Sequence, residues 1–351
     1  MVTELAQELE SLKITPGFLY TEWRDVADAH GATTWDDYRR QPRLGRKTRL
    51  NEKQRMAVWS MLEKLRNRLN ERAAVTWPEV YRRLTQEYKS SEQRPYTHVV
   101  VDECQDITPA QLAFLAALAG TDGDSLFFAG DFAQQIFQTA FSWKSLGVEI
   151  RGRSRTLKIN YRTTHQICGH ADRLLDPEVA DGDGKVEERR GTQSVLQGPP
   201  PAIHIFATPE EEAHVVGAWI KEIIQNGTAP HEVAIFVRSQ DEFFRAQMAI
   251  NASGLPSRVI TDTEDLIPDT LNYGTMHLAK GLEFHAVAVM ACDESIIPQK
   301  DRLNNAGDAS DLDEIYRTEQ YHLYVACTRA RDALYVSAAK PASEFLRDLQ
   351  E

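Results

Sequence analysis

Two adjacent carboxylates, Asp102 and Glu103, follow a short apolar run near the middle of the chain. The run, His98 to Val101, is typical of a buried parallel strand. Ligands bind at the carboxyl edge of parallel sheets, so this pair is expected to face a bound group. The first carboxylate can hold Mg²⁺ on the phosphates of a nucleotide, and the second can orient an attacking water. The alternative is a charged turn, which four acidic or amide residues within 102–106 make less favoured.

Four more clusters of polar and aromatic residues follow along the chain. They are GDFAQQIF (130–137), NYRT (160–163), TMHLAKGLEF (275–284) and YVACTRA (324–330). Each cluster alone is a weak signal, but five in this order leave little room for chance.

The five clusters resemble motifs II to VI of the UvrD/Rep family of superfamily 1 DNA helicases. The resemblance implies a motor that uses ATP and Mg²⁺ to move 3′ to 5′ on single-stranded DNA and to unwind partly duplex DNA. About a hundred residues separate the second of these four clusters from the third. That spacing fits one compact domain without the large inserted accessory domain of UvrD and Rep.

The resemblance gives five residues roles in catalysis. Asp102 would bind the metal, Glu103 would be the catalytic carboxylate and Gln134 would sense the γ-phosphate. Arg162 and Arg329 would reach the γ-phosphate, which suits a group that is always charged and bonds phosphate oxygens in pairs.

The resemblance also implies residues that hold the nucleotide and the DNA. Tyr161 would stack on the adenine, Glu283 would hold the ribose, and Gly281 would complete this nucleotide site. Thr275 and His277 would lie near the DNA backbone. The family often carries an aromatic residue at the position of Thr139, so Phe137, Phe141 or Trp143 is expected to stack on a base instead. A structural role is the alternative for all of these.

The phosphate-binding loop G-x-x-x-x-G-K-[ST] that opens such motors is absent from the sequence. The segment ending in Lys47-Thr48 has Gln41 and Arg46 in place of the two glycines. The segment ending in Lys185 has Val179 at the first glycine position and Val186 in place of Ser or Thr. Neither follows a buried strand, so both are excluded.

The missing loop also bears on folding, because its strand lies beside the strand of motif II in RecA-like domains. Without it, Val99–Val101 would present an unpaired apolar edge, which native proteins avoid. The sequence leaves three explanations open: a second chain or segment that carries the loop, a truncated product, and a rearranged sheet.

Alternating strands and helices after residue 95 predict an α/β fold with RecA-like parallel sheets, the first of them incomplete. The expected domains are a helical subdomain (1–95), a partial first RecA-like domain (96–152) and a second one (153–351). Residues 176–201 are polar and rich in Gly and Pro, which predicts a surface loop. The expected strands are 98–101, 126–129, 157–159, 203–206, 233–237, 286–290 and 333–336, and the expected helices are 109–118, 209–225, one ending before Gly254 and one through 321–326.

The composition, with 42% hydrophobic and 26% charged residues, is that of an ordinary soluble protein, and no apolar run is long enough to span a membrane. The four separated cysteines disfavour a zinc site and fit a reducing cytoplasm. The net charge of −12 argues against a nucleic-acid partner, but affinity depends on local basic patches. Two such stretches are Arg39, Arg40, Arg43, Arg46, Lys47 and Arg49, and Arg151, Arg153, Arg155 and Lys158.

These observations predict the C-terminal part of a UvrD/Rep-type helicase that does not hydrolyse ATP without the missing segment. The alternative is a catalytically inactive module, derived from a helicase, that binds DNA or a partner protein. A nuclease is excluded because no convincing set of clustered carboxylates is present.

Overall fold

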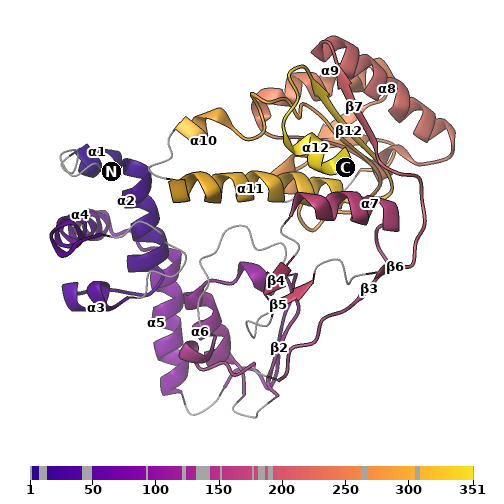
Figure 1. Ribbon diagram of the computed structural model, residues 1–351. Helices are drawn as coiled ribbons and strands as arrows, with labels where there is room; N and C mark the ends of the chain where they lie inside the picture. The colour runs from indigo at the N-terminus through magenta and orange to yellow at the C-terminus, as the bar shows by residue number, and fades with distance from the viewer. Residues whose placement is uncertain are drawn as a thin grey trace. The chain divides into compact units, whose positions relative to one another are not determined.

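The structure is a computed structural model that describes residues 2–7, 14–41, 50–91, 94–120, 124–131, 143–150, 152–175, 178–180, 186–188, 193–261, 267–304 and 309–350. The chain divides into two compact units (Figure 1). The first comprises Met1–Ser154 and Asn305–Asp313, and the second comprises Arg155–Asn304 and Glu314–Glu351. The division into three domains at residues 95 and 152 stays a prediction.

The N-terminal part of the first unit is helical. Its elements are α1 (Val2–Gln7), α2 (Pro16–Glu22), the π-helix η2 (Trp23–Asp28), α3 (Trp35–Arg40), α4 (Glu52–Glu71) and α5 (Trp77–Ser90). Side chains of Thr15, Thr34, Asn51 and Thr76 cap four of these helices. The amphipathic face of α4 packs inward through Trp59, Leu62 and Leu65. As expected, the described residues of this region contain no strand.

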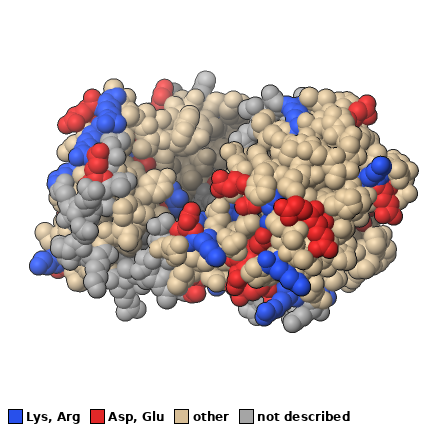
Figure 2. Space-filling model, turned by 90° about the horizontal axis from the view of Figure 1, so that it is seen from above, with Lys and Arg blue, Asp and Glu red and all other residues tan. Residues whose placement is uncertain are grey.

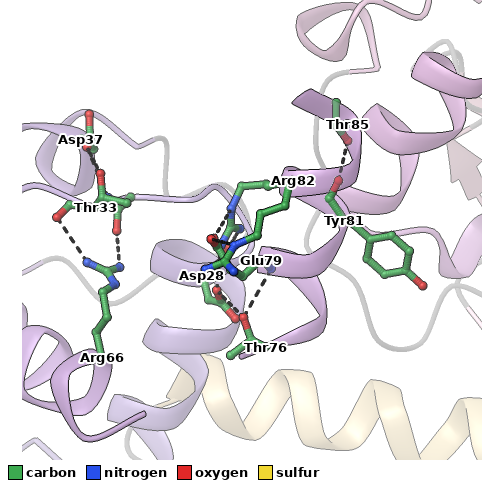
Figure 3. A network of polar contacts seen from close by, with 11 residues as sticks. Asp28, Thr33, Asp37, Arg66, Thr76, Glu79, Tyr81, Arg82 and Thr85 are labelled. Carbon is green, nitrogen blue, oxygen red and sulfur yellow. Dashed lines mark hydrogen bonds and ion pairs between the residues drawn. The ribbon is translucent and has the colours of Figure 1, made fainter. Parts of the chain in front are cut away.

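Two arginines fix the turns between these helices (Figure 3). Arg82 on α5 donates to the backbone and the side chain of Asp28, and its guanidinium lies 2.8 Å from Glu79. Arg66 on α4 donates to the carbonyl oxygens of Ala32 and Thr33. The carbonyl oxygens of Asp28, Ala32 and Thr33 therefore accept hydrogen bonds from side chains of other helices.

The rest of the first unit is a small α/β layer. Strands β1 (Val99–Val101) and β2 (Leu126–Phe128) pair in parallel, with α6 (Pro109–Leu118) between them in sequence. The strand and helix expected here are confirmed. Among the described residues this sheet has two strands only, and Val100 and Phe127, which lie opposite each other, are 74% and 62% exposed. Among the described residues β1 therefore pairs on one side only, and its other edge has no strand partner, as expected.

The second unit contains a six-stranded parallel sheet, which confirms the α/β class. The strand order is β7 (Ala202–Phe206), β12 (Ala330–Ala339), β11 (Phe284–Val289), β8 (Val233–Val237), β10 (Leu271–Thr275) and β9 (Ser257–Val259). Helices α8 (Pro209–Gln225) and α9 (Phe243–Ser253) cover one face, and α7 (His165–Ala171) and α12 (Phe345–Gln350) contact the other (Figure 1). The remaining helices are α10 (Lys300–Asn304) and α11 (Ala309–Cys327).

The sequence did not predict strands β9 and β10. Strand β10 reads LNYGT, and Asn and Gly are depleted in strands. Its place between β8 and β9 overrides this preference: Asn272 donates to the carbonyl of His231, and a Cβ on Gly274 would lie 3.1 Å from Ile260.

The predicted surface loop 176–201 also differs. It contains the short strands β4 (Glu178–Ala180) and β5 (Val186–Glu188), which pair with each other, and β6 (Gln193–Ser194), which pairs with β3 (Ile159–Asn160). Pairing of so few residues leaves no hydrophobic periodicity to detect. Across the described part of the chain, no helix combines the length and the apolarity needed to cross a membrane.

Candidate functional site

The carboxylates of Asp102 and Glu103 are exposed directly after β1, as the sequence predicts. The N–H of Glu103 donates to Oδ1 of Asp102 at 2.8 Å. Within the described chain, the second oxygen of Asp102 accepts no hydrogen bond, so it can bind a metal. Mg²⁺ commonly uses one or two carboxylates together with phosphate oxygens, and Asp102 fits that use.

Glu103 has a left-handed backbone conformation, with φ 53° and ψ 38°. Residues with a Cβ rarely adopt this region, and such outliers cluster at functional sites. The side chain of Gln105, which is 1% exposed, donates to the Glu103 carboxylate and accepts a 3.0 Å hydrogen bond from the N–H of Asp131. The first motif is thus tied to the start of the second.

The four cysteines are free thiols. Burial raises the pKa of Cys104 to about 11 and that of Cys327 to about 12. Both thiols are therefore protonated at neutral pH and are not nucleophiles.

A second group of candidate residues gathers at the amino-terminal edge of the six-stranded sheet, where β11 and β12 begin. Arg162 and Arg329 both donate to one acceptor, the carbonyl oxygen of Leu282. Nε of Arg162 lies 2.7 Å from a carboxylate oxygen of Glu283, close enough for an ion pair but without the alignment of a hydrogen bond. Gly281 precedes this pair with φ +77°, a backbone conformation that favours glycine.

The two arginines differ in exposure. Arg329 is 3% exposed and donates to the carbonyl of Val325 at 3.0 Å and to Oγ1 of Thr328 at 3.2 Å. The side chain of Arg162 is 38% exposed. Tyr161 is 71% exposed, so its ring is open to a planar ligand. Both arginines already have protein partners, but Arg162 is more open to an anion than the buried Arg329.

The residues predicted to lie near DNA are only partly accessible. Thr275, the last residue of β10, is 1% exposed, and its Oγ1 lies 3.4 Å from Nε2 of the exposed His277. The Thr275 side chain faces the interior beside His277, and the placement of both residues near the DNA backbone stays a prediction. The nearby His322 is neutral, since burial and Arg238 lower its pKa to about 3.

The burial of Trp143 disfavours the prediction that its ring stacks on a base. Its ring is 9% exposed and packs edge-on against Phe128 at 4.8 Å within the core of the first unit. A base cannot reach a ring face that the core covers. Gln134, Phe137 and Phe141 lie outside the described residues.

The first basic stretch borders a surface cavity of about 400 Å³. Trp35, Arg39, Arg40, Leu50, Glu52 and Arg55 line it. Arg39 pairs with Asp36 at 2.8 Å, and Arg55 donates to the carbonyl of Arg39. The remaining basic residues of this stretch, and Arg151 of the other, lie outside the described residues. On the face drawn in Figure 2, basic and acidic side chains lie next to each other in small mixed groups.

Sequence reasoning gave no role to three features of these sites. Gln105 could have been noticed in the sequence, because its side-chain amide stands between the acidic pair Asp102-Glu103 and Asp106. The carbonyl oxygen of Leu282 could not have been found from the sequence, because every residue has a backbone carbonyl. The buried pair of Arg238 and Glu319, with two contacts of 2.6 Å, could have been suspected from an arginine directly after a buried strand.

Two family models match the chain. The UvrD/REP helicase N-terminal domain matches residues 25–143, and the UvrD-like helicase C-terminal domain matches residues 261–341. Together the two matches cover more than half of the chain.

Curated relatives align with about half of the chain. ATP-dependent DNA helicase UvrD2 of Mycobacterium tuberculosis is 31% identical over 169 residues, 47% of this chain and 24% of that protein. DNA helicase II of Escherichia coli is 28% identical over 173 residues, 47% of this chain and 23% of that protein. The aligned region thus spans about a quarter of the length of these relatives.

A solved structure, the C-terminal domain of a possible DNA helicase from Lactobacillus plantarum WCFS1, is 23% identical. It covers 54% of this chain and 94% of that one with a TM-score of 0.39. The family matches, with the order of the five motifs, show that the chain belongs to the UvrD/Rep family of helicases.

Proposed function

We propose that the chain is part of an ATP-dependent motor that moves 3′ to 5′ along single-stranded DNA and unwinds duplex DNA. One observation carries the proposal: Arg162 and Arg329, distant in sequence, donate to the same carbonyl oxygen of Leu282, Arg162 also pairs with Glu283, and the exposed Tyr161 directly precedes Arg162 in the chain. Two cations, a carboxylate and an open aromatic ring are the groups that phosphate, ribose and adenine require.

In this proposal the first unit supplies the residues that act on the attacking water. Asp102 would hold Mg²⁺, which neutralises charge on the phosphates. Glu103 would orient the water from its constrained backbone position. Arg162 would bond the γ-phosphate first, and Arg329 would follow by exchanging its contact with Leu282 for a phosphate oxygen.

The missing phosphate-binding loop limits what the 351 residues do alone. We propose that another segment or chain supplies the lysine and the amide cradle for the phosphates.

A catalytically inactive DNA-binding module is the second candidate function, and it is favoured by the absent loop and by the protein acceptors that already occupy both arginines. Binding of a fluorescent ATP analogue distinguishes the two. Weak Mg²⁺-dependent binding that Tyr161→Ala abolishes supports the motor, whereas no binding by the chain, with or without the loop segment, supports the inactive module.

The chain alone is expected to show no helicase-like ATP turnover. Its carboxylates and arginines are present, but the main anchor of the β- and γ-phosphates is absent. A steady-state ATPase assay with single-stranded DNA measures this. Turnover of several molecules per second, on the order of ordinary phosphoryl-transfer enzymes, and its loss in Glu103→Gln would contradict the prediction.

Single-stranded DNA is expected to bind weakly, without sequence preference, partly through the cavity at the end of α3. Arg40→Ala with Arg55→Ala should weaken binding and lower the slope of log affinity against log salt by roughly 1.4, about 0.7 for each phosphate contact. Fluorescence anisotropy of a labelled strand at several salt concentrations measures the slope. Arg72→Ala, at the opposite end of α4, is the control. An unchanged slope in the double variant would remove the cavity from the DNA site.

A further inference from the structure

The side-chain amide of Gln105 makes two hydrogen bonds that lead to different parts of the first unit. Nε2 donates to Oε2 of Glu103, and Oε1 accepts from the backbone N–H of Asp131 at 3.0 Å. A carboxylate only accepts and a backbone N–H only donates, so the orientation of the amide is fixed by its partners. The side chain is 1% exposed and cannot exchange either partner for bulk water.

The backbone around Gln105 leaves little room for adjustment. A Cβ on Gly130 would lie 2.4 Å from Oε1 of Gln105 and 2.9 Å from the backbone nitrogen of Cys104. The N–H of Cys104 donates to the carbonyl of Ala129 at 2.9 Å, which joins the ends of β1 and β2. Close packing of this kind transmits small displacements, because the interior does not deform freely.

We propose that Gln105 is a positioning residue that makes the orientation of the Glu103 carboxylate depend on the backbone at Asp131. This inference rests on the proposed function, in which Glu103 orients the attacking water. Glu103 is held from both sides: its backbone conformation is left-handed, and its side chain accepts the Gln105 amide. A shift of the chain at Asp131 moves the amide and, through it, the carboxylate.

Two substitutions separate the two hydrogen bonds. Gln105→Glu keeps an oxygen for the N–H of Asp131 but replaces the donor to Glu103 with a like charge. Gln105→Leu removes both bonds at similar volume. Gln111→Leu is the matched control, because Gln111 is another amide with two hydrogen bonds, both to Thr108 at the start of α6.

Hydrogen exchange in the full chain reports the bond to Asp131. The Asp131 amide is expected to stay protected in the unsubstituted chain, in Gln105→Glu and in Gln111→Leu, and to exchange at least about 10-fold faster in Gln105→Leu, since its acceptor is lost. Equal protection in Gln105→Leu and the unsubstituted chain would overturn the inference.

ATP turnover, measured with the loop segment supplied, reports the bond to Glu103. Both Gln105 variants are expected to lose about 10- to 100-fold in kcat, the cost of misplacing a catalytic group, with the KM for ATP unchanged. A merely structural role predicts instead that Gln105→Glu, with Asp131 still protected, retains its turnover, and that result overturns the inference while leaving the proposed function intact. If even the unsubstituted protein shows no turnover, the proposed function fails, and with it the role assigned to Gln105.

Discussion

Arg329→Ala is expected to lower the ATP turnover number by about 10³ or more in the chain supplied with a phosphate-binding loop. An arginine that neutralises charge on the transferring phosphoryl group contributes on this order. Glu103→Gln should also stop hydrolysis but should still bind ATP, because both arginines remain. Affinity for single-stranded DNA without nucleotide should be nearly unchanged in both variants.

The control for Arg329→Ala is Arg331→Ala, two residues further along the chain. Arg331 is exposed and pairs with its neighbour Asp332, so its loss should leave turnover and stability close to normal. Because Arg329 also holds the carbonyls of Val325 and Leu282, thermal unfolding must show that Arg329→Ala is folded. A variant that hydrolyses ATP normally but no longer binds DNA would place Arg329 in the nucleic-acid site instead.

Strongly periodic or strongly apolar segments were predictable from the sequence. The run Val233–Val237 is buried at every residue, and its composition alone indicates a strand covered on both faces. Helix α8 was predicted with both of its ends, because the proline at its start and the amphipathic pattern agree, and Thr208 caps it in the structure. By contrast, β10 could not be predicted, because Asn272 and Gly274 are unusual in strands. Its strand conformation comes from pairing with β8 and β9.

The sequence predicted which residue types form the candidate site, but it did not predict which of their side chains are buried. The motifs name Asp102 and Arg162, and the structure leaves both accessible. Residue type did not reveal that Trp143 packs into a core or that Thr275 faces inward. Both are strand-end or loop residues, for which the direction of the side chain depends on tertiary packing.

Arg245→Met is expected to cause the largest loss of stability in the second unit, about 3–5 kcal/mol, the range for removing one partner of a buried ion pair. The guanidinium on α9 is 2% exposed and lies between two carboxylates, with contacts of 3.0 Å to Glu212 on α8 and 2.5 Å to Asp293 after β11. Without it, two buried anions face each other with no cation.

The same carboxylates hold the carboxyl ends of β11 and β12. Glu212 accepts from the N–H of Ala291 at 3.0 Å and from Ser337 at 2.7 Å, and Asp293 accepts from the N–H of Ala339 at 2.7 Å. Both carboxylates therefore stay in place when Arg245 is replaced, and the variant cannot relieve the repulsion by turning them outward.

The loss should depend on pH in a defined direction. In Arg245→Met one buried carboxyl takes up a proton, so its pKa in the folded state rises above the unfolded value. Stability from a group with a raised pKa is present at low pH and is lost as the pH rises through the folded pKa.

Urea unfolding at about pH 5 and about pH 7 should therefore show a smaller loss of stability in Arg245→Met at the lower pH. Arg347→Met, which removes an exposed arginine from α12, should show little deficit at either pH. An equal, pH-independent loss in Arg245→Met would mean that packing, and not charge, makes Arg245 important.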